Sequence, residues 1–243
     1  MNRFAVITGG TKGLGQAIAE RLLSEGFDVL LTFGADQERA RQVEAELRDV
    51  YRKSEIAVAQ ADATSTSSID VIAGYIENHD RRLDALILNA GLTARGSLEE
   101  LDLDTWDRVF RANVDIPLFT IQRLMDRFAA GGSIVFTGSL MGFQPHSMSL
   151  AYGVSKSAVS SLVKNLVKFL GPRGIRVNAV APGFIDTEWQ LAKPTHVRDS
   201  INSKISLGRF ATPDEVTDPY IMLVNNSYIT GETIVIDGGY SYR

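Results

Sequence analysis

The chain alternates short apolar runs with longer stretches in which apolar positions repeat at helical spacing. The short runs predict strands at residues 3–8, 27–31, 55–60, 84–88, 132–138, 174–180 and 233–236. The amphipathic stretches predict helices at residues 16–24, 36–50, 66–79, 102–128, 152–170 and 213–224. Strand and helix alternating through short turns are typical of a parallel sheet covered on both faces. We therefore expect an α/β fold, a Rossmann-type doubly wound parallel sheet of about seven strands.

The segment at residues 186–206 departs from this alternation. It shows no clear strand or helix pattern and contains Pro194. A long connection of this kind in a compact domain is more often a functional lid than slack chain. We therefore expect a single domain over residues 1–243, in which the segment at about 186–206 covers the site.

The composition is ordinary for one globular domain of 243 residues. Apolar residues make up 44% of the chain and charged residues 22%, and the net charge is −4 with the basic residues scattered. This distribution gives no electrostatic argument for nucleic acid. The first predicted strand begins near residue 3, which leaves no room for a signal peptide, and no apolar run approaches the roughly 18 residues of a membrane span. We expect a cytoplasmic protein without a membrane partner.

Cysteine and metal chemistry are not expected. The chain contains no cysteine, which excludes a disulfide framework, a thiol nucleophile and a thiolate metal site. Its histidines, His79, His146 and His196, are not clustered along the chain, so the sequence predicts no metal site.

A glycine-rich turn separates the first predicted strand from the first predicted helix. Gly9, Gly13 and Gly15 follow a G-x3-G-x-G spacing, which differs from the commoner G-x-G-x-x-G fingerprint. Glycines let the backbone approach a pyrophosphate, and the N-terminus of the following helix supplies free N–H donors. Glycine is also the ordinary residue at any position of positive φ, but the strand before and the helix after favour dinucleotide binding.

A second pattern, S-x12-Y-x3-K, contains Ser139, Tyr152 and Lys156. Because residues four apart share one face of a helix, the Lys156 ammonium is expected one turn from the Tyr152 ring. A free phenol ionises near pH ~10, and a neighbouring cation stabilises the phenolate, so we expect Lys156 to lower the pKa of Tyr152. Ser139 would hold a substrate oxygen close to the phenol. Tyrosine and lysine also occur at this spacing by chance, and it is the glycine-rich turn that favours the catalytic interpretation.

Several segments in register resemble the short-chain dehydrogenase/reductase family, and the resemblance runs nearly end to end. They are Thr8-Gly9-x3-Gly13-x-Gly15, Asn89-Ala90-Gly91, Asn113 with Ser139, Tyr152 and Lys156, Pro182-Gly183 with Thr187, and Asp237-Gly238-Gly239. The resemblance implies an NAD(P)-dependent oxidoreductase that interconverts a ketone and a secondary alcohol by hydride transfer. It also implies a catalytic tetrad of Asn113, Ser139, Tyr152 and Lys156.

The resemblance implies a role for each site residue. Ser139 and Tyr152 would hydrogen-bond the substrate carbonyl, and Tyr152 would act as the general acid/base. Lys156 would keep the phenol acidic and hold the nicotinamide ribose. Asn113, polar where helix propensity favours other residues, would anchor a water that connects Lys156 to solvent. The residues implied to contact the cofactor are Gly9, Thr11, Lys12, Gly13, Leu14, Gly15, Phe33, Asp62, Ala63, Asn89, Ala90, Gly91, Tyr152, Lys156, Pro182, Gly183, Ile185 and Thr187.

The cofactor preference is argued from the end of the second strand. In the family an acid at this position binds the adenosine ribose and selects NAD, whereas this chain has Phe33 there. Lys12 and Arg39 are neighbouring cations, although Arg39 on a helix is also explained by solvation, and Asp36 argues in the other direction. We expect NADP(H) to be favoured over NAD(H).

Two cofactor positions each have a second interpretation. By resemblance the Asp62 carboxylate would bind the adenine amino group, but a capping acid before Ala63 and Thr64 explains it equally well. Asn89 and the small residues after it could form only a turn at the end of a strand. The same small residues would also let a ribose lie close to the backbone.

The substrate is the least determined feature. Met141, Phe143 and Trp189 favour an apolar acyl or ring-bearing carbonyl compound, although apolar loop residues are more often packing. Among subfamilies the chain is most similar to the 3-oxoacyl-[acyl-carrier-protein] reductases, at residues 171–178 and 228–233. Those reductases dock an acidic carrier protein through two basic residues beside the active-site entrance. Arg173 matches one of them, and Ala130 stands near the other.

The sequence therefore allows several kinds of substrate and partner. A small carbonyl or alcohol substrate is expected, and it could be carried by an acyl carrier protein or coenzyme A, or be a free ketone or a secondary-metabolite intermediate. A nucleotide-binding regulator without turnover is less favoured, because the chain keeps both Tyr152 and Lys156. By resemblance, the helices at 102–128 and 152–170 and the tail at 238–243 pack against other copies, so a homotetramer is expected.

Overall fold

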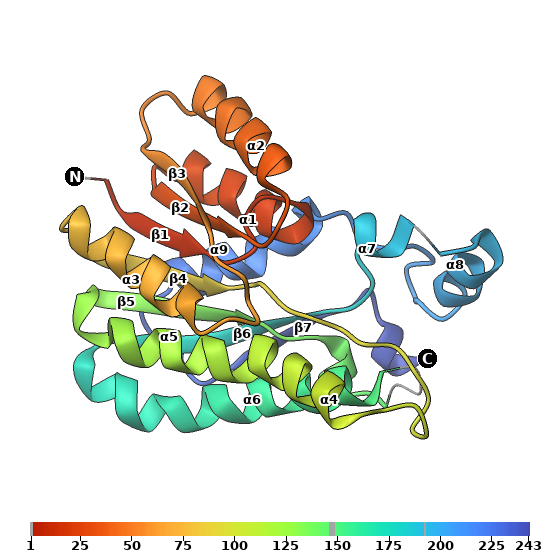
Figure 1. Cartoon of the computed structure of the whole chain (residues 1–243). Helices are drawn as coiled ribbons and strands as arrows, with labels where there is room; N and C mark the ends of the chain where they lie inside the picture. Colours follow the sequence, from red (N-terminus) through yellow and green to blue (C-terminus); the bar gives the residue numbers. More distant parts are fainter. Residues whose placement is uncertain (1, 146–148, 192) are drawn as a thin grey trace.

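One parallel sheet of seven strands organises the chain (Figure 1), and the computed structural model describes residues 2–145, 149–191 and 193–243. The strands are Phe4–Ile7 (β1), Asp28–Phe33 (β2), Ile56–Gln60 (β3), Leu83–Leu88 (β4), Phe128–Thr137 (β5), Arg176–Pro182 (β6) and Thr233–Ile236 (β7). Their order across the sheet is β3-β2-β1-β4-β5-β6-β7. The order reverses between β1 and β4, and in open α/β sheets ligands bind outside the carboxyl ends of the strands at such a point. The predicted doubly wound sheet is confirmed.

Helices cover both faces of the sheet (Figure 1). One face carries α1 (Gly13–Ser24), α2 (Gln37–Val50) and α9 (Thr217–Asn225). The other carries α3 (Ser67–Asn78), α5 (Ile116–Leu124) and α6 (Leu150–Leu170), with α4 (Leu103–Phe110) packed against α6. Successive strand residues alternate between the two cores, so that Ile7 of β1 joins the first and Val6 the second. Because both faces are buried, the strands read as continuous apolar runs.

The predicted helix at 102–128 is interrupted. A π-helical turn, η1 (Arg111–Asp115), separates α4 from α5, and a 3₁₀ turn, η2 (Met125–Arg127), leads directly into β5. An α-helical hydrogen bond to the Asn113 carbonyl would have to come from the residue four positions later, which is Pro117 and has no N–H. The helical ladder therefore changes at the predicted site residue Asn113, and π turns of this kind are frequent at functional sites.

The segment at 186–206 contains two short helices where no pattern was predicted. They are α7 (Glu188–Leu191) and α8 (Thr195–Asn202). Figure 1 shows them beyond the carboxyl ends of the strands, away from the two helical layers. The remaining short turns are η3 (Leu140–Gly142), η4 (Gly171–Arg173), η5 (Asp214–Val216) and η6 (Tyr240–Tyr242). No helix in the described part of the chain is both long and apolar enough to cross a membrane.

Candidate active site

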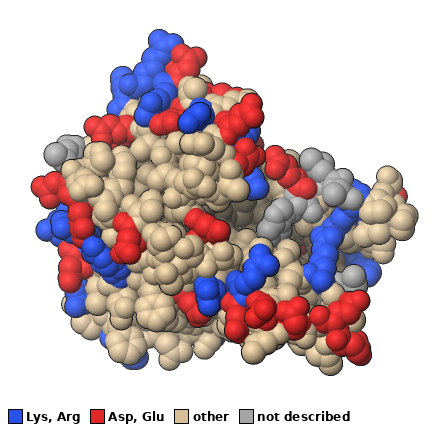
Figure 2. Space-filling view, viewed as in Figure 1, with Lys and Arg blue, Asp and Glu red and all other residues tan. Residues whose placement is uncertain are grey.

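The four predicted catalytic residues come from three elements that meet beside the strand-order reversal. Ser139 follows the carboxyl end of β5, Tyr152 and Lys156 lie in the first two turns of α6, and Asn113 lies in η1. Ser139, Lys156 and Asn113 are buried, whereas Tyr152 keeps part of its surface exposed. Figure 2 shows that this face of the molecule is hollowed near its middle, with charged side chains of both signs around the hollow.

The glycine-rich turn needs glycine at three positions and leads directly into α1. Gly9 and Gly13 have positive φ values of 63° and 51°, which favour glycine. At Gly15 the limit is space, because a Cβ would lie 2.1 Å from the Gly9 carbonyl oxygen. Helix α1 begins at Gly13, and its N-cap residue, Lys12, makes no side-chain capping hydrogen bond. The first N–H groups of α1 thus point out of the turn without a side-chain cap, as a phosphate site requires.

Asn89 and Thr8 brace this turn against β4. The Asn89 side-chain amide donates to the carbonyl oxygens of Thr8 (3.1 Å) and Gly9 (3.3 Å). In return, the Thr8 hydroxyl accepts from the backbone N–H groups of Asn89 (2.9 Å) and Ala90 (3.0 Å). Asn89 therefore holds the turn in place through its side chain. The small residues beside it, Ala90 and Gly91, are half-buried.

Asn113 uses its side chain to join two parts of the site. Its Oδ1 accepts from the Leu92 N–H (2.8 Å), and its Nδ2 donates to the Leu92 carbonyl (2.9 Å) and to the Ser155 hydroxyl (2.8 Å). A Cβ at Gly91 would lie 3.0 Å from Asn113 Oδ1 and 3.5 Å from Lys156 Nζ. Gly91 is therefore the point at which the loop after β4 touches both Asn113 and Lys156. Only the side chain of Asn113 is committed to these bonds, and its backbone carbonyl lacks the usual donor at Pro117.

Lys156 lies against the face of the Tyr152 ring. Its ammonium donates to the Thr137 carbonyl (2.7 Å) and stands 5.6 Å from the centre of the Tyr152 ring. Ser139 lies at the N-terminal end of η3, where its hydroxyl accepts from the Met141 N–H (3.1 Å). The three side chains of the S-x12-Y-x3-K pattern are thus brought together, as predicted, by the end of β5 and the start of α6.

Burial shifts the pKa values of both Tyr152 and Lys156. It raises the pKa of the Tyr152 phenol, and a hydrogen bond with the Ser139 hydroxyl partly offsets that rise. Burial also lowers the pKa of the Lys156 ammonium to about 8. For the chain by itself, the prediction that Lys156 lowers the pKa of Tyr152 is therefore wrong. The cation faces the ring and the Thr137 carbonyl, so desolvation of the phenol is the larger effect.

The connection after β6 approaches the glycine-rich turn. Pro182 ends β6, and a Cβ at Gly183 would lie 2.8 Å from the Asp237 Cα. Ile185 forms an isolated bridge with Ala211, and its carbonyl accepts from the Thr187 N–H (2.9 Å). The Thr187 side chain lies 3.4 Å from the position that a Cβ of Gly13 would occupy. The predicted nicotinamide-contacting segment is thus brought against the predicted phosphate-binding turn.

The end of β2 carries no free carboxylate. Phe33 is buried, and the Asp36 side chain caps α2 by accepting from the Arg39 N–H (3.1 Å). The Arg39 guanidinium donates to Gln16 of α1 (3.0 Å), so Arg39 is positioned and not merely solvated. Lys12, the N-cap residue of α1, is exposed.

A small hollow lies at the carboxyl ends of β1 to β4. Ala63 and Ala90 are among its lining residues, as expected for the adenosine side of a dinucleotide site. Asp62 accepts from the N–H (2.8 Å) and hydroxyl (2.9 Å) of Thr64, which fits its interpretation as a capping acid. Thr11 and Leu14 of the predicted cofactor site are buried.

Sequence reasoning did not single out three residues that position the site. The Thr137 carbonyl holds Lys156, Ser155 joins Asn113 to α6, and the Ser149 hydroxyl donates to the Ala94 carbonyl just before α6 begins. Serine and threonine at such places carry no pattern of their own. His146 and the side chain of Trp189, both discussed from the sequence, lie outside what the structure describes. Among the described residues no three His, Asp or Glu side chains group as metal ligands would.

Comparison with known proteins agrees with this geometry. The model of a family described as enoyl-(acyl carrier protein) reductase matches residues 9–241. A 3-oxoacyl-[acyl-carrier-protein] reductase of Aquifex aeolicus is 33% identical over 241 residues, which cover 98% of this chain and 96% of the relative. The structure of a short-chain dehydrogenase/reductase from Serratia marcescens matches with a TM-score of 0.92 at 32% identity, covering 98% of both chains. A short-chain dehydrogenase from Burkholderia cenocepacia, solved in complex with NADP, matches with the same TM-score, identity and coverage.

Proposed function

Because this chain belongs to the short-chain dehydrogenase/reductase family, we propose that it is an NADP(H)-dependent oxidoreductase that interconverts a ketone and a secondary alcohol. The observation that carries this proposal is the placement of Ser139, Tyr152 and Lys156 at the end of β5, next to a glycine-rich turn that can bind a pyrophosphate. A hydroxyl, a phenol and an ammonium at one edge of a dinucleotide fold supply hydrogen bonds and a proton, but no redox equivalent. The cofactor must supply the latter.

The residues at the predicted cofactor site fit NADP(H). The closely packed turn at Gly9, Gly13 and Gly15 leaves backbone N–H groups for the phosphates. With Phe33 buried and Asp36 engaged as a helix cap, no free acid at the end of β2 repels a 2′-phosphate. Lys12 and Arg39 would face that phosphate. The NADP bound to the relative from Burkholderia cenocepacia supports the same choice.

In the reductive direction, Ser139 and Tyr152 would hold the substrate carbonyl oxygen. When bound, NADPH supplies the hydride that reduces the carbonyl carbon. The Tyr152 phenol, kept protonated by burial, donates its proton to the alkoxide oxygen. Lys156, fixed by the Thr137 carbonyl beneath the ring, places a positive charge close to the phenolate that remains.

Reprotonation of the site needs a path to solvent. The backbone carbonyl of Asn113 is deprived of an α-helical donor by Pro117, and Asn113 lies next to Lys156 through Gly91. We propose that a water on this carbonyl connects Lys156 to solvent. The side chain of Asn113 would have a different task, which is to fix Leu92 and Ser155 around that path.

The geometry gives little support to carrier-protein docking beside this chain's own active site. Arg173 precedes β6 and Ala130 lies near the start of β5, so both stand at the amino edge of the sheet, opposite Ser139. Arg173 is also paired with Asp126 (2.6 Å). We therefore propose a small carbonyl compound, either free or as a thioester, as the substrate, with the segment at 186–206 covering it.

Exposed apolar side chains on α5 and α6 support a homotetramer. They include Phe119, Leu150, Val154 and Phe169, the last of which is 72% exposed. We propose that these helices pack against a second copy of the chain, because large apolar side chains grouped on a surface mark protein interfaces.

Oxidation of NADPH and NADH, measured across short and long 3-oxoacyl thioesters, cyclic ketones and sugar-like carbonyl compounds, tests the proposed function. We expect carbonyl-dependent oxidation of NADPH with at least one class, and a lower KM for NADPH than for NADH. A clear preference for NADH would overturn the cofactor choice. Binding of NADPH without oxidation in the presence of any carbonyl compound would instead favour a nucleotide-binding regulator.

The pH dependence should report Lys156. The pKa of its ammonium is about 8, whereas burial raises the pKa of the phenol, so both groups are mainly protonated at pH 7 and Lys156 loses its proton first as the pH rises. Since kcat/KM for NADPH reflects groups of the free enzyme, we expect it to fall above about pH 8. Lys156→Met should lower kcat/KM and remove the pH dependence. A profile that stays level until the phenol titrates would contradict this assignment.

A further inference from the structure

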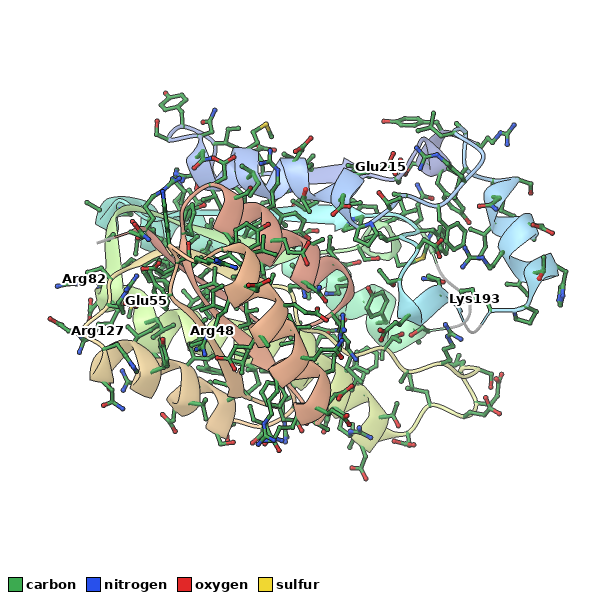
Figure 3. All side chains as sticks on the ribbon, turned by 90° about the horizontal axis from the view of Figure 1, so that it is seen from above. Arg48, Glu55, Arg82, Arg127, Lys193 and Glu215 are labelled. Atoms are coloured by element: carbon green, nitrogen blue, oxygen red, sulfur yellow. The ribbon has the colours of Figure 1, made fainter. Side chains whose placement is uncertain are left out.

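Two basic side chains, Arg95 and Lys193, come from opposite sides of the candidate active site. Arg95 lies in the connection after β4, and Lys193 lies between α7 and α8, in the connection after β6. Because β5 lies between β4 and β6 in the sheet, these two connections flank the strand end that carries Ser139. Figure 3 shows Lys193 at the opposite end of the molecule from Arg82 and Arg127, which stand at the amino ends of β4 and β5.

Hydrogen bonds at or next to each residue fix the backbone of both connections. The Ala94 carbonyl accepts from the Ser149 hydroxyl, which also lies 3.1 Å from the Thr93 hydroxyl. Ser149 stands three residues before Tyr152. These hydrogen bonds therefore tie the loop that contains Arg95 to the start of α6. On the other side, the Lys193 N–H donates to the Gln190 carbonyl (3.1 Å).

The charges of Arg95 and Lys193 are not compensated within the described chain. Neither side chain forms an ion pair with any residue that the structure describes. Burial lowers the pKa of Lys193, and the Arg95 guanidinium lowers it further, so the two cations lie close enough to repel each other. Arg95 is exposed and Lys193 half-buried, so both are open to a ligand, and neighbouring charges of one sign attract ligands of the opposite sign.

Nearby acids are engaged elsewhere. Asp186 pairs with Arg198 (2.9 Å), whose guanidinium also donates to the Gln190 carbonyl (3.3 Å). Glu100 accepts from the Ser97 N–H (2.9 Å), and hydrogen bonds within the same loop lower the pKa of Glu99. These acids therefore satisfy their own segments and leave Arg95 and Lys193 available to an anion from outside.

We propose that Arg95 and Lys193 bind an anionic group of the substrate, a carboxylate or a phosphate, while Ser139 and Tyr152 hold its carbonyl. This inference rests on the proposed function, because it concerns the compound reduced at that site. The guanidinium offers two parallel donors to such a group, and the ammonium adds a point charge from the other side. The substrate class is then a ketone with a negatively charged end, and not a wholly apolar one.

Matched pairs of carbonyl compounds test this proposal. 4-Oxopentanoate is compared with its methyl ester for a carboxylate, and acetoacetyl-coenzyme A with the acetoacetyl thioester of N-acetylcysteamine for phosphates. The measured quantity is the ratio of kcat/KM for the charged and the neutral member at saturating NADPH, in which any effect on cofactor binding cancels. It is determined for the wild type, Arg95→Gln and Lys193→Gln. Lys53→Gln is the control, because Lys53 is exposed and precedes β3 at the opposite edge of the sheet.

We expect the wild type to prefer the charged member of at least one pair, and that pair identifies the anion as carboxylate or phosphate. Arg95→Gln and Lys193→Gln should each reduce the preference by about tenfold, as is usual for a charged hydrogen bond. The neutral member should change by less than about twofold, and Lys53→Gln should change neither member.

Two results would overturn the proposal. If the neutral compounds are reduced but neither pair shows a preference, or if both variants slow the two members equally, the anion site is wrong and the proposed function stands. If no carbonyl compound of either kind is reduced, both the anion site and the proposed function fail.

Discussion

Replacing Tyr152 with phenylalanine is expected to lower the reductive kcat by roughly 10²- to 10⁴-fold, the range that general acid catalysis contributes. The phenol is the proton donor of the proposed reaction, and burial keeps it protonated at neutral pH. Phenylalanine keeps the ring that packs over Lys156 at 5.6 Å, so the site should retain its shape. Binding of NADPH, measured by fluorescence titration, should therefore change by less than about threefold.

The matched control is Tyr228→Phe. Tyr228 is 96% exposed in the connection between α9 and β7, so the same chemical change there should leave kcat and cofactor affinity unaltered. Thermal unfolding of Tyr152→Phe should lie close to that of the wild type, which separates loss of the proton donor from loss of folded protein. A Tyr152→Phe variant with a nearly normal kcat would exclude Tyr152 as the general acid.

Gly15→Ala is expected to destroy the cofactor site while leaving the catalytic side chains in place. The new Cβ would lie 2.1 Å from the Gly9 carbonyl oxygen and 2.6 Å from Asn89 Nδ2. The first contact is with backbone, so the turn itself has to move. Overpacking of this kind costs about 1–3 kcal/mol of folding free energy. Because the displaced N–H groups are those proposed to bind the pyrophosphate, affinity for NADPH should fall by about tenfold or more.

Gly74→Ala is the control for this variant. Gly74 lies in α3, where a Cβ would meet nothing within 4 Å, so alanine should stabilise the helix by about 0.5–1 kcal/mol and leave NADPH binding unchanged. Calorimetric titration with NADPH and thermal unfolding measure both effects. Normal NADPH affinity in Gly15→Ala would contradict the proposed phosphate-binding role of the turn.

Much of the fold follows from periodicity. Strands buried on both faces are continuous apolar runs, and β1 and β2 lie within a residue or two of the predicted bounds. The start of β5 was placed late, because Gly131 and Gly132 resemble a turn more than a strand. Helices α7 and α8 were not predicted, because helices of four and eight residues are too short to display an apolar face.

At the candidate site, the sequence spacing of residues predicts which side chains lie together but not how they are oriented. The S-x12-Y-x3-K pattern correctly predicts that Tyr152 and Lys156 share one helix face, but not where the ammonium points. The Thr137 carbonyl captures Lys156 Nζ at 2.7 Å, and burial of the phenol then outweighs the effect of the cation on its pKa. The π turn at Asn113 had one signal in the sequence, Pro117 four residues later, which removes the donor that an α-helix needs.

The charged pair Arg95 and Lys193 is likewise invisible in the sequence, because the two residues are almost a hundred positions apart. The sheet order brings their connections to either side of β5. Met141 and Phe143 favour an apolar carbonyl compound, and Phe143 is 49% exposed in the connection after β5. The proposed anion site adds the polarity that these loop residues lack.

Transfer of deuterium from NADPH labelled at the nicotinamide C4 position would demonstrate hydride transfer to the carbonyl carbon. With a carbonyl compound that supports turnover, the label should appear on the carbinol carbon of the alcohol, from only one of the two C4 faces. Tyr152→Phe should slow the appearance of that label by the same factor as kcat. Consumption of the carbonyl compound without deuterium on the carbinol carbon, or NADPH that binds tightly and never transfers its label, would contradict the proposed hydride transfer.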